Sequence, residues 1–162
     1  MKHTIYLAGG CFWGVQKYFD QFDGILETEV GYANGPEKAP SYEEVCHNSG
    51  HAETLRIVYD DEMISLTKIL NDYFFVIDPL SVNRQGHDHG IQYRTGIYYT
   101  EEAQLAEILP VYQEQERLAG AKLAVELMPL ANFFSAEEYH QKYLDKNPGG
   151  YCHIPKEYFE MK

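Results

Sequence analysis

The hydrophobic positions of this chain change their period several times, and each period predicts a different kind of element. Short apolar runs predict strands, whereas apolar residues that recur every three or four positions predict amphipathic helices. The predicted strands are residues 4–8, 25–32, 53–60, 94–100 and 122–128. The predicted helices are residues 12–22, 65–78 and 101–118, followed by one that starts at the capping-box pattern of residues 135–138.

Glycine and proline mark the ends of these elements. Pro79 stops the second helix, Pro110 is expected to bend the third, and residues 147–150 end the last. Polar loops are predicted at residues 33–41 and 81–92. Strands and helices therefore interleave irregularly. This order predicts an α+β fold, a two-layer sandwich in which a mixed sheet is covered mainly on one face by helices.

Composition and charge narrow the functional classes. With 162 residues, 44% of them hydrophobic, and no repeat or composition shift, the chain predicts one domain over residues 1–162, with residues 147–162 as a tail. The net charge is −12 and no cluster of Lys or Arg occurs, so we expect no nucleic-acid partner. No run approaches the roughly 20 apolar residues of a membrane span, and the start lacks a signal-peptide pattern. We therefore expect no membrane association and a cytoplasmic location.

Cys11 lies where the first predicted strand meets the first predicted helix. Three cysteines, an odd number, argue against a framework of structural disulfides and for reduced thiols. Backbone N–H groups at a helix N-terminus favour a thiolate, and Gly9 and Gly10 allow a tight turn just before it. Phe12 and Trp13 would add an apolar wall next to the sulfur. The alternative is that Cys11 is a small buried hydrophobic residue of an ordinary core.

Several polar side chains suited to chemistry lie beside predicted strand ends, where loops can bring them into one pocket. They are Tyr42, Glu53, Asp88 and Tyr93. A carboxyl group in a partly apolar pocket keeps its proton to higher pH, so Glu53 is a candidate general acid. The tyrosine hydroxyls are candidates to hold a substrate oxygen. Taken singly, Glu53 could equally be a solvated acid at a strand end, and the two tyrosines half-buried packing residues.

A metal site is the sharpest competing interpretation, because cysteine and histidine are metal ligands. The candidate ligands are Cys46, His47, His51, His87, His89, Cys152 and His153. Their spacings match no familiar zinc pattern. We therefore expect no metal ion, and we interpret most of these histidines as surface or loop residues.

Seven short motifs follow one another in order across nearly the whole chain. They are Gly10-Cys11-Phe12-Trp13-Gly14, Gly31-Tyr32-Ala33, Tyr42-Glu43-Glu44-Val45-Cys46, Gly50-His51-Ala52-Glu53, Asp88-His89-Gly90-Ile91-Gln92-Tyr93-Arg94, Tyr139-His140-Gln141-Lys142-Tyr143-Leu144 and Asn147-Pro148. In these motifs the chain resembles the A-type peptide-methionine sulfoxide reductases. One such match can arise by accident, but seven in sequence very rarely do.

The resemblance implies a mixed-sheet α+β domain with a ferredoxin-like core. It also implies reduction of the S epimer of methionine sulfoxide, free or in peptides and oxidised proteins, and so a role in protein repair under oxidative stress. No metal or organic cofactor is implied, and we expect a monomer.

The resemblance also implies roles for the residues singled out above. Cys11 would be the nucleophile and Glu53 the proton donor. Tyr42 and Tyr93 would hold the sulfoxide oxygen, and Asp88 would be a polar supporter of the pocket. Phe12 and Trp13 would receive the substrate methyl group.

Regeneration of Cys11 is implied to pass through Cys152, which falls where many family members carry a resolving thiol. A Cys11–Cys152 disulfide would then be reduced by an external dithiol, most simply thioredoxin, with glutaredoxin as another candidate. The chain departs from the family pattern between Val45 and Glu53, where it is one residue shorter. We expect Cys46, which lies in this segment, to be a bystander thiol.

Two other functions remain open from the residues alone. A thiol-binding or scaffold protein would keep its function when Cys11 is replaced. A thiol peroxidase would turn over hydroperoxide faster than sulfoxide. Neither explains why an acid and two tyrosines accompany a thiol at a helix start.

Overall fold

The computed structural model describes residues 1–36, 39–46, 49–150 and 154–160. Its main sheet has six strands in the order β7-β6-β1-β3-β2-β8. Their bounds are β1 (Lys2–Gly9), β2 (Ile25–Ala33), β3 (Ala52–Asp60), β6 (Thr95–Tyr99), β7 (Glu126–Pro129) and β8 (Phe133–Ser135). A separate two-stranded ladder pairs β4 (Arg84–Gln85) with β5 (Asp88–His89).

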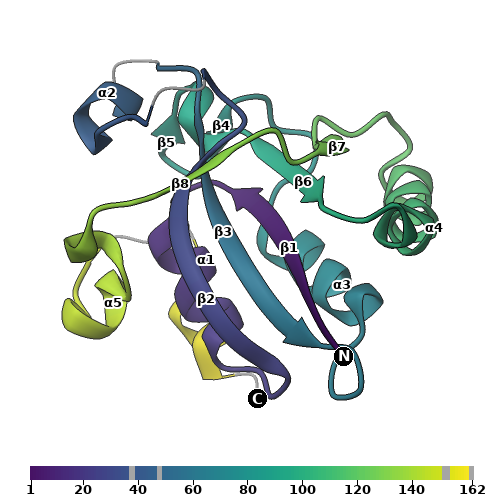
Figure 1. Ribbon diagram of the computed structural model, residues 1–162. Coiled ribbons are helices and arrows are strands. Elements are labelled where there is room, and N and C mark those ends of the chain that lie inside the picture. Colours follow the sequence, from purple (N-terminus) through teal and green to yellow (C-terminus); the bar gives the residue numbers. More distant parts are fainter. Residues whose placement is uncertain (37–38, 47–48, 151–153, 161–162) are drawn as a thin grey trace.

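The helices connect these strands and cover the sheet. They are α1 (Phe12–Asp20), α2 (Tyr42–Cys46), α3 (Leu66–Val76), α4 (Glu102–Ala119) and α5 (Tyr143–Lys146). Three 3₁₀ helices are η1 (Ile91–Tyr93), η2 (Glu138–His140) and η3 (Lys156–Glu160). Figure 1 shows α1 and α3 together on one face of the sheet, as the sequence pattern predicts.

The centre of the molecule has ferredoxin-like topology. The chain order β1-α1-β2-β3-α3-β6 gives four neighbouring antiparallel strands in the order β6-β1-β3-β2. Strand β7 then adds parallel to β6, and β8 adds antiparallel to β2, so the sheet is mixed. The α+β fold class and the ferredoxin-like core expected from the sequence are therefore confirmed.

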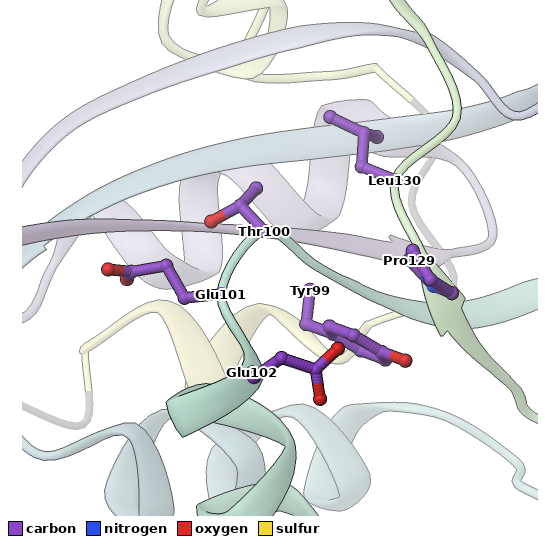
Figure 2. Close-up of a pocket in the computed structure, with 6 residues that line it drawn as sticks. All are labelled: Tyr99, Thr100, Glu101, Glu102, Pro129 and Leu130. Atoms are coloured by element: carbon purple, nitrogen blue, oxygen red, sulfur yellow. The ribbon is translucent and has the colours of Figure 1, made fainter.

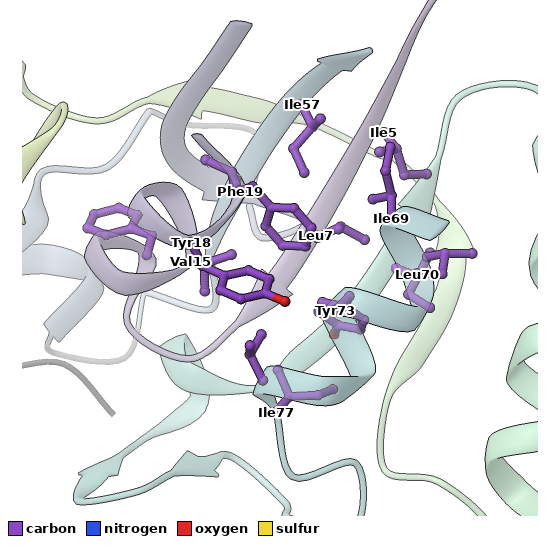
Figure 3. Close-up of a cluster of buried hydrophobic side chains, with 14 of the residues drawn as sticks. Ile5, Leu7, Val15, Tyr18, Phe19, Ile57, Ile69, Leu70, Tyr73 and Ile77 are labelled. Carbon is purple, nitrogen blue, oxygen red and sulfur yellow. The ribbon is translucent and has the colours of Figure 1, made fainter. Parts of the chain in front are cut away.

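The core lies between the sheet and the helices α1 and α3. Figure 3 shows side chains from β1, such as Ile5 and Leu7, meeting Phe19 of α1 and Ile69 of α3. These residues come from the alternating and the helical patterns that predicted the elements. Burying each large apolar side chain contributes about 1.5–3 kcal/mol to stability. This core fixes α1 against β1 and so fixes the turn that joins them.

Helices α3 and α4 start at side-chain caps. The hydroxyl oxygen of Ser65 accepts a hydrogen bond from the backbone N–H of Lys68 at 3.0 Å, so α3 begins where the apolar period does. Glu101 and Gln104 form a capping box at the start of α4, and Gly120 ends that helix with a φ of +67°. Helix α4 continues through Pro110.

The helix predicted to start at Ser135 is wrong. Ser135 is the last residue of β8, where it pairs with Gly31, and its hydroxyl donates to the Glu29 carboxylate on the neighbouring strand. The hydroxyl that would cap a helix is therefore used across the sheet. In place of the predicted helix, the chain forms two short helical turns, η2 and α5.

Three other boundaries differ from the prediction. The predicted loop over residues 81–92 contains the β4–β5 ladder and the start of η1. Tyr42 begins the short helix α2 rather than lying in a loop. The strand predicted from residue 122 begins only at Glu126, where pairing with β6 starts. Strand pairing is a tertiary contact, so the local pattern does not fix these limits.

Candidate active site

The turn between β1 and α1 places Cys11 at the start of the helix. Gly10 has a φ of +86°, a conformation that favours glycine, and Cys11 follows with extended backbone at the N-cap position of α1. Tyr73 of α3 holds the end of β1, just before this turn. Its hydroxyl donates to the Ala8 carbonyl at 2.6 Å and accepts from the Gly96 N–H at 3.1 Å. Cys11 is 8% exposed. The expected position of the thiol at a helix N-terminus is confirmed.

Glu53 lies on β3, beside the same helix start. Its side chain is buried, with 1% exposed, and its Oε1 accepts the backbone N–H of Phe12 at 3.3 Å. Its Oε2 is buried and has no hydrogen-bond partner among the described residues. Because Oε1 is held as an acceptor, the proton of the neutral acid belongs on Oε2.

The surroundings of Glu53 keep it protonated at neutral pH. Burial raises the pKa of Glu53 to about 8, against a partly opposing effect of the Phe12 N–H, and the negative charge of Asp88 raises it further. Glu53 is therefore a carboxylic acid that can donate a proton at pH 7. This is the state that a general acid needs.

Asp88 lies on the β4–β5 ladder, opposite Gln85. One of its carboxyl oxygens, Oδ2, is buried without a hydrogen-bond partner in the described part of the chain. Burial raises the pKa of Asp88, although the nearby His87 and His89 act in the opposite direction. Glu53 and Asp88 thus each have a buried oxygen without a partner among the described residues, and the charge of Asp88 raises the pKa of Glu53.

Tyr42 and Tyr93 bring two hydroxyls to the same acids. Burial raises the pKa of both, and the charge of Glu53 adds to the shift in each case. Cys11 and Asp88 also raise the pKa of Tyr93. The two hydroxyls therefore stay protonated and act as hydrogen-bond donors. Cys11, Glu53, Asp88 and the two tyrosines therefore lie close enough for their charges to act on one another.

Phe12 and Trp13 follow Cys11 on the first turn of α1. Phe12 is buried, and its ring packs against Tyr32 with the centroids 5.8 Å apart. Trp13 is half-buried and stacks on Tyr143, with centroids 3.8 Å apart and an interplanar angle of 12°. The two rings therefore form an apolar surface directly after the thiol.

The segment from Glu137 to Tyr143 contributes residues to which the sequence analysis gave no role. Glu137 accepts hydrogen bonds from the Tyr32 hydroxyl at 2.7 Å and from the Tyr42 backbone N–H at 2.9 Å. His140 accepts the indole N–H of Trp13. The aromatic and polar residues at 139–143 indicate that this segment could belong to a site. The sequence does not show which residues they contact, because these lie about 100 positions earlier in the chain.

The other cysteines and histidines that the structure describes form no group suited to a metal ion. Cys46 is exposed, and it interacts with the Tyr42 hydroxyl at the edge of the pocket. Cys152, with His153, lies outside the described residues, as does His47. No group of three His, Cys, Asp or Glu side chains suited to a metal ion occurs among the described residues. Within that same part of the chain, no helix is long and apolar enough to cross a membrane.

A depression of about 290 Å³ lies elsewhere, between the end of β6, the start of α4 and the end of β7 (Figure 2). Its lining residues are Tyr99, Thr100, Glu101, Glu102, Pro129 and Leu130. It contains no thiol and none of the residues predicted for catalysis. Of the residues predicted for catalysis, Cys11 and Glu53 lie instead at the start of α1.

Comparison with known proteins identifies close relatives along the whole chain. The family model described as Peptide methionine sulfoxide reductase matches residues 3–162. A protein of Lachnoclostridium phytofermentans, named Peptide methionine sulfoxide reductase MsrA, is 59% identical over 155 residues. That match covers 95% of this chain and 93% of the relative.

Solved structures share the fold. Mxr1 from Saccharomyces cerevisiae in reduced form matches with a TM-score of 0.90 and 38% identity, over 95% of this chain and 91% of that one. Mxr1 in complex with Trx2 matches with a TM-score of 0.62 and 26% identity, over 88% of this chain and 84% of that one.

Proposed function

Because this chain belongs to the peptide methionine sulfoxide reductase family, we propose that the pocket at the start of α1 reduces the S epimer of methionine sulfoxide, with Cys11 as nucleophile. Membership confirms the resemblance carried by the seven motifs, and with it the class of enzyme, a peptide-methionine (S)-S-oxide reductase. The observation that carries the assignment of roles is the Glu53 carboxyl. It is neutral at pH 7 and has a free Oε2 beside the helix that Cys11 caps.

The first step needs an acid, because a sulfoxide oxygen is a poor leaving group until it is protonated. The Cys11 thiolate attacks the sulfoxide sulfur while the proton on Glu53 Oε2 passes to the oxygen. The hydroxyls of Tyr42 and Tyr93 hold this oxygen by donating hydrogen bonds. Asp88 supports the step by keeping Glu53 protonated before the substrate arrives.

The oxygen then passes from the substrate sulfur to the Cys11 sulfur as the bond between the two sulfur atoms breaks, and methionine leaves. The substrate sulfur is reduced, Cys11 is oxidised to a sulfenic acid, and the ionised Glu53 regains its proton from solvent. The methyl group of the substrate lies against Phe12 and Trp13 during this step. Free methionine sulfoxide, oxidised peptides and oxidised proteins all carry the group that this pocket accepts.

Regeneration is proposed to use Cys152 and an external dithiol. The Cys152 thiol condenses with the sulfenic acid, releases water and forms a Cys11–Cys152 disulfide, which a dithiol protein reduces by exchange. The complex of Mxr1 with Trx2 supports a thioredoxin as that reductant. A catalytic thiol needs a reducing compartment, which supports a cytoplasmic location. All proposed pocket residues come from one chain, so a monomer is sufficient.

The decisive assay supplies separated S and R epimers of a methionine sulfoxide peptide with dithiothreitol. We expect the intact protein to turn over the S epimer only and Cys11→Ser to turn over neither. Cys46→Ser is the matched control, because it removes another free thiol and should keep the activity. Turnover of neither epimer by the intact protein would contradict the proposal and favour a thiol-binding protein.

A second assay tests the resolving thiol. Without any reductant, Cys152→Ser should still release one methionine per chain, because the first step needs only Cys11. With thioredoxin as the reductant, we expect continuous turnover by Cys152→Ser to be lost. Continuous turnover at the level of the intact protein would show that Cys152 is not required.

A further inference from the structure

Tyr73 lies on α3 and is fully buried, with 0% exposed. Figure 3 shows it among the core side chains between α3 and β1. Its hydroxyl nevertheless forms hydrogen bonds with the main chain of the sheet. It donates to the Ala8 carbonyl at 2.6 Å and accepts the backbone N–H of Gly96 at 3.1 Å. One side chain of the helix layer thus binds two neighbouring strands.

The two strands are bridged at the end of their ladder. Ala8 of β1 and Gly96 of β6 lie opposite each other, and the pair of Gly9 with Thr95 follows as the last one. The Gly96 carbonyl oxygen is also 3.3 Å from the Tyr73 hydroxyl, but the single hydroxyl proton goes to the nearer Ala8 oxygen. The hydroxyl therefore helps to set the spacing of β1 and β6 where these strands reach the proposed pocket.

Each of the two bonded residues is close in the chain to a residue of the proposed chemistry. Ala8 precedes Cys11 by three positions, and Gly96 follows Tyr93 by three positions. The charge of Cys11 acts on the Tyr93 hydroxyl, so the two groups are near each other in space as well. The Tyr73 hydroxyl thus connects the segment of the nucleophile to the segment of a hydroxyl proposed to hold the sulfoxide oxygen.

The ring of Tyr73 also packs against the backbone of Gly9. A methyl group placed on Gly9 would lie 3.4 Å from Cε1 of Tyr73 and 3.1 Å from Cγ2 of Ile77. Helix α3 therefore approaches the main chain of β1 without an intervening side chain. A shift of Tyr73 would pass directly to the backbone that leads into Cys11.

Packing alone does not explain the hydroxyl, because a phenylalanine ring would fill the same space. A buried hydroxyl is unfavourable unless it forms hydrogen bonds, and this one both donates and accepts. Burial raises the pKa of Tyr73 well above its usual value, although the Gly96 backbone acts in the opposite direction. The hydroxyl therefore keeps its proton and supplies a bridge that phenylalanine cannot form.

We propose that Tyr73 is a positioning residue, which fixes the placement of the Cys11 thiol relative to the Tyr93 hydroxyl. The proposal rests on the proposed function, in which the thiolate attacks the sulfoxide sulfur while Tyr93 holds the oxygen of the same group. Both contacts must be made at once, so a small change in their relative placement slows the reaction. Tyr73 acts through the main chain of β1 and β6, and its effect is on oxygen transfer rather than on substrate binding.

The test uses the full chain and the S epimer of a methionine sulfoxide peptide, without reductant, so that regeneration does not limit the release of methionine. Tyr73→Phe keeps the ring but removes the bridge. We expect the rate constant at saturating substrate to fall about tenfold, with the half-saturating concentration within about twofold of the intact value. Tyr18→Phe is the matched control, because Tyr18 is equally buried and its hydroxyl donates to Asp72 at 3.2 Å. It should change neither constant.

A double-mutant cycle separates positioning from a general loosening of the core. Tyr93→Phe removes the hydroxyl whose placement Tyr73 is proposed to fix. In that background we expect Tyr73→Phe to lower the rate by no more than about twofold. Alkylation of Cys11 by iodoacetamide does not involve the tyrosine hydroxyls. Followed on the peptide that contains Cys11, its rate should also stay within about twofold in Tyr73→Phe.

A measurement on the intact protein needs no variant and remains available if Tyr73→Phe does not fold. In the ¹⁵N-labelled protein, we expect the Gly96 amide proton to exchange slowly with solvent. It should also show a nuclear Overhauser effect to the hydroxyl proton of Tyr73. Absence of this contact would overturn the proposal.

Four results with the variants would also overturn it. The first is an unchanged rate in Tyr73→Phe, and the second is an equal loss in Tyr18→Phe. The third is an equal effect of Tyr73→Phe with and without the Tyr93 hydroxyl. The fourth is alkylation of Cys11 that slows as much as methionine release, which would mean that the thiol itself is disturbed. Failure of the proposed function would appear separately, as undiminished turnover by Cys11→Ser.

Discussion

Strand β3 carries a carboxyl group near each end, and the two groups are in opposite states. Asp60, at the C-terminal end, accepts the backbone N–H of Glu62 at 3.0 Å and pairs with the amino group of Met1 at 3.4 Å. These contacts lower the pKa of Asp60. Glu53, at the other end, is buried with a single N–H donor, and its pKa is raised to about 8.

The charged groups at the two ends of the sheet differ in the same way, in their burial and in their partners. Figure 1 shows the N-terminus beside the arrowhead of β3, and α2, β4 and β5 gathered at the opposite end. Charges near the N-terminus are half-buried or exposed, and they are paired, as between His3 and Asp61. Acids near α1 are buried and partly unpaired. A carboxyl group is a stabilising ion at one end and a neutral acid at the other, because exposure to solvent and hydrogen-bond partners differ.

Replacing each of these two acids by its amide should give the largest difference in activity between the two ends of the sheet. Glu53→Gln removes the proton donor, so we expect kcat/KM for the S epimer to fall by about 10²–10⁴-fold, the usual contribution of a general acid. Asp60→Asn is the matched control at the other end and should leave kcat/KM unchanged. Steady-state kinetics of the two variants make the comparison. Full activity of Glu53→Gln would mean that another group supplies the proton.

The same variant should show that Glu53 lowers stability as the pH rises from 4.5 to about 8. In the unfolded chain Glu53 ionises near its ordinary pKa of 4.5, but in the folded protein it keeps its proton to about pH 8. Stability from this group is therefore greatest below pH 4.5 and is lost as the pH rises to about 8. Between these limits we expect the free energy of unfolding of Glu53→Gln, relative to the intact protein, to increase by about 1.4 kcal/mol per pH unit.

Denaturant titrations of both proteins at several pH values between 5 and 8 measure this difference. A difference that does not change with pH would mean that Glu53 ionises normally in the folded protein.

Asp88→Asn should sharpen the account of how the pKa of Glu53 is raised. In the intact enzyme we expect kcat/KM to decline above about pH 8, by about tenfold per pH unit, as Glu53 loses its proton. Removing the charge of Asp88 lowers the pKa of Glu53, so this decline should begin at lower pH. The measurement is the pH profile of kcat/KM, normalised to its own maximum so that other effects of the substitution cancel. A decline at unchanged pH would show that burial alone sets the pKa.

The smallest effect is expected at the N-terminal end. Asp61 pairs with His3 and with the amino group of Met1, and its pKa is lowered while that of His3 is raised. The contribution of Asp61 is lost as the pH falls below 3.8, and that of His3 as the pH rises above 6.5. Asp61→Asn should therefore lower the thermal midpoint slightly near pH 5–6, and less at high salt. An effect that persists in 1 M salt would mean that the pairing is not electrostatic.

The sequence predicts the part of the site that depends on local chain geometry. Cys11 lies in the turn between β1 and α1, directly after Gly10. The spacing of the apolar residues predicts both the strand and the helix. Glu53 can be found because it lies near the start of β3, the strand next to β1. Ser135 was misplaced because its hydroxyl has a partner on β2 rather than in its own turn. His140 was given no role because its acceptor serves Trp13, 127 positions earlier, and no local pattern contains that distance.

The register of β3 between β1 and β2 also has a consequence for folding. Leu7 pairs with Leu55 and Tyr32 with Glu53, so the thiol and its acid meet only when strands about 50 residues apart have aligned. A slip of one residue would turn Glu53 to the opposite face of the sheet. Such long-range pairings are slow to form. The entropy cost of closing the chain between two strands comes before the contacts that compensate for it. We therefore expect recovery of activity during refolding to report the pairing of β3 with both of its neighbours.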